Sequence, residues 1–236
     1  TCLVDLFFPE VGEATVKVLR DQGVEVSFPR GQTCCGQPAF NSGYWDEARA
    51  AALHFLDVFE DTDAYIVTPS GSCALMVKKE YPHLFEDDRK TRARAVALGD
   101  RVYELSSFLV DVLGVEDVGP RYAGRVTYHA SCHLTRGLGV TEAPRRLLQA
   151  VHGVEYVEMK NAGRCCGFGG TFAVKMADVS YAMVEDKIAD IRDTQADTLV
   201  ACDAGCLMQI AGAIRRTDVS AKTYHLAQIL AGETDA

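Results

Sequence analysis

The chain has 236 residues, of which 48% are hydrophobic and 24% are charged, a composition typical of a globular protein with an apolar core. The formal net charge of -9, without any run of Lys or Arg, argues against a nucleic-acid-binding surface. No apolar stretch reaches the roughly 18 residues that a transmembrane helix needs, so we expect no membrane span.

The first half of the sequence predicts helices that alternate with strands. Apolar residues at helical spacing indicate helices at 11–21, 45–59, 89–98 and 105–115, and Cys73 is expected to begin another. Short β-rich runs predict strands at 24–28 and 65–68.

The second half repeats this plan after Gly119-Pro120, the expected junction between two domains at 1–118 and 119–236. Strands are predicted at 125–129, 154–157, 198–201 and 219–224, and helices at 141–151, 177–194, 225–231 and from Cys206. Alternation at this spacing predicts parallel βαβ units. We therefore predict an α/β fold of two tandem Rossmann-like parallel-sheet repeats, related by internal duplication.

The nine cysteines carry the clearest functional signal. The order single Cys, Cys-Cys-Gly, single Cys occurs twice, with equivalent positions offset by 130, 131, 131 and 133 residues. The first set is Cys2, Cys34, Cys35 and Cys73, and the second is Cys132, Cys165, Cys166 and Cys206. Cys202 stands outside the pattern. Because a predicted strand leads into the second set, we expect a strand-forming segment to precede the first set as well.

The predicted strands bring each set together. The cysteines follow strands directly or through a loop, and the carboxyl ends of parallel strands share one edge of a sheet. We therefore expect the four thiols of each set to converge there, although they are far apart in the sequence.

Four thiols in one place indicate soft-metal binding or redox chemistry. Adjacent cysteines are difficult to place on one zinc ion and easier to place on two irons of an iron–sulfur cluster, which four thiolates usually hold. Structural zinc and thiol–disulfide exchange are alternatives, but both favour CxxC motifs, which the sets lack. An odd number of cysteines in a long chain argues against a disulfide scaffold and favours a reducing cytoplasm.

Four further residues are candidate contacts to a cofactor. Gly36 and Gly167 would let the backbone approach a cluster with a positive φ. His129 and His133 flank Cys132 and could ligate a metal, hydrogen-bond to sulfur or transfer a proton. The alternative is that these histidines cap a helix or fill the core.

The cysteine pattern resembles the CCG-type cysteine-rich domain, which occurs in heterodisulfide reductases and in the iron–sulfur subunits of glycolate oxidase. The flanking sequences are more similar still to the lactate-utilisation protein A group of bacterial iron–sulfur-binding proteins. The segments that carry this resemblance are QTCCGQPAFNSGY at 32–44, PSGSCALM at 69–76, YHASCHLTRGLG at 128–139, RCCGFGGTF at 164–172 and AGCLMQIAG at 204–212.

This resemblance covers almost the whole chain. It implies a cytoplasmic iron–sulfur subunit that carries one or two clusters, expected to be [4Fe–4S], in a complex that oxidises L-lactate or a related 2-hydroxyacid. It also implies a ferredoxin-like iron–sulfur partner and a third small subunit. The alternatives are a cluster that is itself the catalytic centre, as in the heterodisulfide reductases, and a non-catalytic zinc-binding module.

The chain departs from the reductase pattern, in which a terminal CxxC supplies a fifth cysteine to each cluster. Ser70 and Asp203 stand at the leading positions of that motif, and Cys202 is one residue early. We therefore expect four thiolates at each site, with an oxygen ligand from Ser70 or Asp203 as a further option. Cys202 is a candidate ninth ligand.

Overall fold

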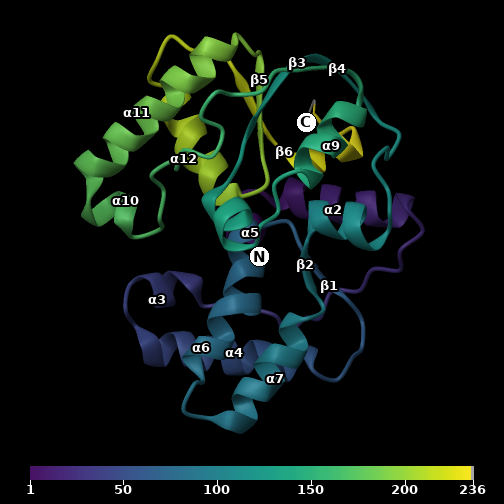
Figure 1. Cartoon of the computed structure of the whole chain (residues 1–236), viewed down its shortest axis with the longest axis vertical. Coiled ribbons are helices and arrows are strands. Elements are labelled where there is room, and N and C mark those ends of the chain that lie inside the picture. Colours follow the sequence, from purple (N-terminus) through teal and green to yellow (C-terminus); the bar gives the residue numbers. More distant parts are fainter. Residues whose placement is uncertain (235–236) are drawn as a thin grey trace.

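The computed structural model describes residues 1–234, with a sheet and its covering helices in the upper part of the view and a helical part below (Figure 1). The strands are β1 (Ile66–Thr68), β2 (Val102–Glu104), β3 (Arg121–His129), β4 (His152–Tyr156), β5 (Thr198–Ala201) and β6 (Lys222–His225). The α-helices are α1 (Cys2–Phe7), α2 (Pro9–Asp21), α3 (Gln37–Asn41), α4 (Trp45–Phe59), α5 (Gly71–Leu75), α6 (Tyr81–Leu84), α7 (Arg89–Gly99), α8 (Leu105–Ser107), α9 (Ala143–Ala150), α10 (Phe172–Lys175), α11 (Ala177–Thr194), α12 (Ala204–Ile214) and α13 (Leu226–Ala231). Three π-helical segments are η1 (Met76–Glu80), η2 (Phe108–Val112) and η3 (His133–Gly137).

All strand pairs are parallel, as the strand–helix alternation predicts. β4, β3, β5 and β6 form a four-stranded sheet in that order, and β1 pairs with β2 in a separate sheet. Figure 1 shows α11 and α12 on one side of the larger sheet and α2 and α9 on the other. The α/β class is thus confirmed, whereas the internal duplication stays a prediction.

Most predicted elements form where the sequence places them. α4, α11 and β5 have the predicted bounds, and α2, α7, α9 and β3 differ from them only at their ends. The strand predicted at 24–28 is wrong: within residues 1–234 no strand lies beside this segment, and a strand requires a hydrogen-bonding partner. Val24 and Val26 nevertheless pack against the core of the larger sheet. The short elements α1, α3, α6, α10, β2 and η3 were not predicted.

Two main clusters of buried side chains support the fold. The larger surrounds the four-stranded sheet, and residues from the first half of the chain complete it, including Val18 of α2 and Leu109 of η2. The smaller lies among α4, α6 and α7, with Leu56, Tyr81 and Leu98 at its centre. The two cores are therefore not separated at residue 119, and the division into domains there stays a prediction.

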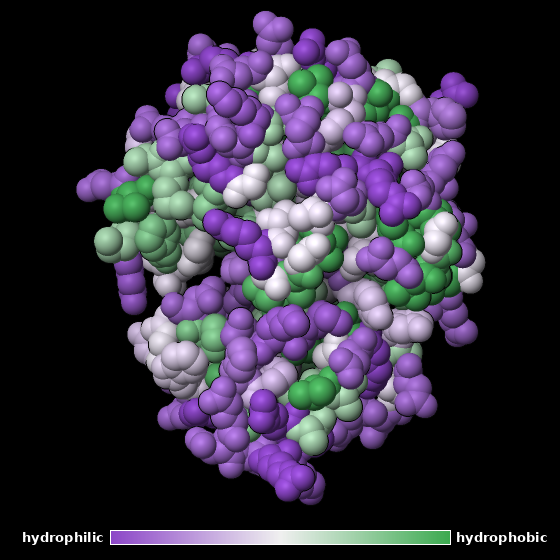
Figure 2. Space-filling model, in the orientation of Figure 1, coloured by the Kyte–Doolittle hydropathy of each residue, from purple (hydrophilic) through white to green (hydrophobic). Residues whose placement is uncertain are grey.

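Some apolar side chains lie on the surface near the second Cys-Cys-Gly motif. Val174, Met176, Val179 and Tyr181 of the α10–α11 region are exposed. Figure 2 shows a group of hydrophobic residues at the left of the view, where α10 and α11 lie in Figure 1. None of the helices in the described part of the chain combines the length and apolarity that a membrane crossing requires.

Candidate metal centres

The four cysteines of the first set lie together although three separate segments supply them. Cys2 is in α1, Cys34 and Cys35 precede α3, and Cys73 is in the first turn of α5. Cys2 Sγ lies 3.4 Å from Cys34 Sγ, and Cys35 Sγ lies 3.6 Å from Cys73 Sγ. The pKa of Cys34 is lowered because the thiols of Cys2 and Cys35 hydrogen-bond to its sulfur. The four sulfurs thus form one connected group.

The second set has the same arrangement at the carboxyl end of the larger sheet. Cys132 follows β3, the vicinal pair lies in the loop after β4, and Cys206 is in the first turn of α12. Cys166 Sγ and Cys206 Sγ lie within 4.8 Å of each other, and Cys165 is near enough to Cys132 and Cys166 to shift the pKa of both thiols. The neighbouring Cys165 thiol, together with burial, raises the pKa of the Cys132 thiol.

The two candidate histidines have different environments. His129 is fully buried, and one of its nitrogens forms a group with Cys166 Sγ and Cys206 Sγ in which all three atoms lie within 4.8 Å of one another. Burial lowers the pKa of His129 to about 3, so its ring is neutral. His133 is partly exposed in η3, near enough to influence the pKa of the Cys132 thiol.

Gly36 and Gly167 follow the vicinal cysteines with positive φ values of 83° and 81°. A Cβ at Gly36 would lie 3.0 Å from Ala51 Cβ of α4, and a Cβ at Gly167 would lie 2.6 Å from the Ser180 carbonyl oxygen of α11. Both glycines are therefore required by their left-handed backbone and by a nearby helix. Their contact with a cofactor stays a prediction.

Ser70 and Asp203 act as helix caps. Ser70 Oγ accepts a hydrogen bond from the Cys73 N–H at 3.3 Å, and Asp203 Oδ1 accepts one from the Gly205 N–H at 3.3 Å. Both residues are buried. These hydrogen bonds use the oxygens that were candidate metal ligands in the sequence, and they fix the first turns that carry Cys73 and Cys206.

Cys202 lies in a different environment from the two sets. It is fully buried, its sulfur accepts a hydrogen bond from the Tyr128 hydroxyl at 3.5 Å, and it lies beside Glu104. Among residues 1–234, no hydrogen bond joins it to another cysteine. The structure therefore brings eight of the nine cysteines into the two sets and gives Cys202 a polar partner in the core.

Lys187 was not a candidate in the sequence, although it lies on the apolar face of the predicted helix 177–194. Its side chain is buried, and its ammonium donates hydrogen bonds to the carbonyls of Asn161 and Ala162 at 2.8 and 3.1 Å. The thiols of Cys166 and Cys206 are near enough to influence its titration. The signal that could have identified Lys187 in the sequence is its position as a charged residue on the apolar face of a predicted helix.

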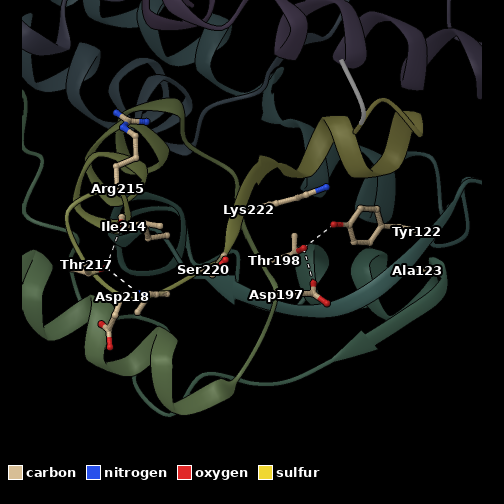
Figure 3. Close-up of a pocket in the computed structure, with 12 residues that line it drawn as sticks. Tyr122, Ala123, Asp197, Thr198, Ile214, Arg215, Thr217, Asp218, Ser220 and Lys222 are labelled. Carbon is tan, nitrogen blue, oxygen red and sulfur yellow. Dashed lines mark hydrogen bonds between the residues drawn. The ribbon is translucent and has the colours of Figure 1, made fainter.

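A separate surface cavity of about 770 Å³ lies at the amino end of the larger sheet, opposite the cysteines. Figure 3 shows Tyr122, Thr198 and Lys222 at its edge, with the Thr198 hydroxyl hydrogen-bonded to Tyr122 at 2.7 Å and to Asp197 at 2.8 Å. No cysteine lines this cavity, so it is distinct from the candidate metal centres.

Comparison with known protein families finds a match that covers both cysteine sets. The cysteine-rich domain family CCG matches residues 1–78 and 126–211, which include all nine cysteines. The chain belongs to the CCG cysteine-rich domain family. In this CCG protein, the matched segments also contain Ser70, Asp203 and both Cys-Cys-Gly glycines.

Curated relatives match the CCG protein over nearly its full length. Lactate utilization protein A of Geobacillus sp. (strain WCH70) is 54% identical over 230 residues, which cover 98% of this chain and 96% of the relative. The proteins of the same name from Geobacillus kaustophilus (strain HTA426) and Bacillus subtilis (strain 168) are 54% and 50% identical over 98% of this chain and 95% and 96% of their own lengths.

The donor atoms of each set fit a soft metal or an iron–sulfur cluster. Such clusters are held by thiolates, usually four, and each set of this CCG protein offers four connected thiols. Cys73 and Cys206 lie in the first turns of α5 and α12, where backbone N–H groups favour negative charge. The fold thus brings the four thiol ligands of each set together.

Proposed function

We propose that this CCG protein is an iron–sulfur electron-transfer subunit of a complex that oxidises L-lactate, or a related 2-hydroxyacid, to the 2-oxoacid. The convergence of four thiols in each of two sets carries the proposal. The substrate class is taken from the relatives, which are named for lactate utilization.

Each set would hold one [4Fe–4S] cluster, the first through Cys2, Cys34, Cys35 and Cys73, the second through Cys132, Cys165, Cys166 and Cys206. A bound cluster supplies one-electron redox chemistry. The surrounding residues hold the thiolates in place through the capped turns of α5 and α12. Near the second set, the charge of Lys187 would offset the negative charge of the thiolates.

The complex that we propose is cytoplasmic and contains a ferredoxin-like iron–sulfur protein and a third small subunit. The surface beside the cysteines supports such assembly. The Ser42 and Thr171 hydroxyls lie 2.9 Å apart, so the segments that follow the two Cys-Cys-Gly motifs are neighbours. Exposed Val174 and Met176 lie directly beyond Thr171 and offer apolar area to a partner.

Two other functions remain as outcomes of the test. In one, a cluster of this protein is the catalytic centre, and in the other the thiols hold structural zinc. Protein purified without oxygen should contain iron and sulfide in similar amounts and absorb visible light. Stoichiometric zinc without such absorbance would overturn the iron–sulfur proposal. The complete complex, but not this protein alone, should reduce an acceptor with L-lactate, whereas turnover by the isolated protein would indicate a catalytic cluster.

A further inference from the structure

The fold leaves one buried histidine without a hydrogen-bonding partner. His129 ends β3, a central strand of the larger sheet, and its backbone is fixed in register with Ala201 of β5. The side chain is 0% exposed, and both of its ring nitrogens lack hydrogen bonds to residues 1–234. Buried polar groups are normally paired, so the missing partner requires a specific explanation.

His225 provides an internal comparison. It ends β6 at the same edge of the sheet and is also 0% exposed. Its two nitrogens are both used, because Nε2 lies 3.0 Å from the Pro69 carbonyl and Nδ1 accepts the Ala227 N–H at 3.1 Å. The fold can therefore provide hydrogen-bonding partners for both nitrogens of a buried histidine at this edge, and it provides none for His129 within residues 1–234.

Two donor atoms of the second cysteine set lie close to the His129 ring. One ring nitrogen, Cys166 Sγ and Cys206 Sγ all lie within 4.8 Å of one another, a group that can surround a single metal ion. In the described part of the chain, this is the one such group of three or more His, Cys, Asp or Glu side chains. A neutral imidazole offers one lone pair, and imidazole is a suitable ligand for both iron and zinc.

We infer that His129 is a nitrogen ligand at the second site, beside the four thiols of the second set. The inference rests on the proposed function because it takes the bound group to be an iron–sulfur cluster. A neutral imidazole adds no negative charge, and histidine ligation raises the potential of clusters in other proteins. The second site would then be more readily reduced than one with a fifth thiolate in place of this histidine.

Pulsed electron paramagnetic resonance of the reduced protein tests this ligation directly. The double variant Cys34→Ser/Cys35→Ser disrupts the first set, so that the signal comes from the second. A strong nitrogen hyperfine coupling is expected, and it should change to the ¹⁵N pattern when the protein is prepared with ¹⁵N-labelled histidine. This labelling needs no substitution at His129 and is therefore independent of any folding defect.

Two substitutions in this background assign the nitrogen. His129→Cys keeps a soft donor at the position, so the protein should retain its iron. The strong nitrogen hyperfine coupling should disappear, and the reduction potential of the cluster should fall. His133→Ala is the matched control on the other side of Cys132, and it should leave the coupling intact. Iron-loaded protein without strong nitrogen coupling, or with coupling that survives in His129→Cys, would overturn the inference and leave the proposed function intact. Absence of iron from the wild-type protein would overturn both.

Discussion

The carboxylate of Asp203 joins the two cysteine-bearing helices through Ser70. Its Oδ2 accepts hydrogen bonds from Ser70 Oγ at 3.4 Å and from the Ser72 N–H at 3.0 Å, both at the start of α5. Its Oδ1 accepts the Gly205 N–H at the start of α12. One side chain from the second half of the chain therefore caps the helix of Cys73 and the helix of Cys206.

Asp203→Ala should weaken both cysteine sites together. The buried cap at 6% exposure supports two helix starts, and its loss is expected to cost about 2–4 kcal/mol of unfolding free energy. Urea unfolding and iron analysis of the reconstituted protein provide the measurement. Asp88→Ala is the control, since Asp88 caps the distant helix α7 through Lys90 and Thr91. Equal iron content in the two variants would contradict a role for Asp203 in both sites.

The vicinal cysteines should each determine the iron content of one site. Cys35→Ser and Cys166→Ser are each expected to remove about half of the iron, and the double variant should remove nearly all of it. Cys202→Ala is the control, because this sulfur is paired with the Tyr128 hydroxyl and should not affect iron. Loss of iron in Cys202→Ala would make this ninth cysteine a ligand.

Glu104 should make the stability of the apoprotein depend on pH. Burial raises the pKa of its carboxyl from 4.5 to about 7, although its Oε2 accepts hydrogen bonds from the Ser106 and Ser107 N–H groups. Between pH 4.5 and 7 the folded state holds a proton on Glu104 that the unfolded state has released, so the contribution of this carboxyl to stability falls as pH rises through this window. The effect is on the order of 3 kcal/mol.

Urea unfolding at several pH values checks this slope. Glu104→Gln cannot ionise and should lose the part of the slope that this carboxyl contributes, while retaining a side chain of the same size. The variant leaves the neighbouring Tyr128 and Cys202 unchanged, so a difference in slope is assigned to the Glu104 carboxyl. Identical slopes for the wild-type protein and the variant would show that Glu104 is not the titrating group.

Gly167 should tolerate no side chain. Alanine there would adopt φ near 81° and place its Cβ 2.6 Å from the Ser180 carbonyl oxygen, so we expect a loss of at least about 2 kcal/mol. Gly163→Ala is a matched control on the same loop, since a Cβ there meets no atom of the described residues within 4 Å. Thermal unfolding compares the two, and equal stability would contradict the strain argument.

The sequence alone determined the elements with strong local patterns. The apolar periodicity of α4 and α11 fixed their bounds, and the β-rich run of β5 fixed the strand between α11 and α12. The repeated order of cysteines, read with the rule that parallel strands share one carboxyl edge, also predicted that the thiols of the second set meet, whereas in the first set only Cys73 follows a strand. These inferences succeed because periodicity and strand direction are local properties that a linear pattern records.

The tertiary structure decided what depends on partners distant in the sequence. Residues 24–28 form no strand because no neighbouring strand pairs with them within residues 1–234. Ser70 and Asp203 meet across 133 positions as caps, and Cys202 turns toward Tyr128 instead of joining a set. The unpartnered nitrogens of His129 become visible only when the atoms around the ring are placed. Burial and hydrogen bonding between distant segments are properties of the folded chain, and no local pattern contains them.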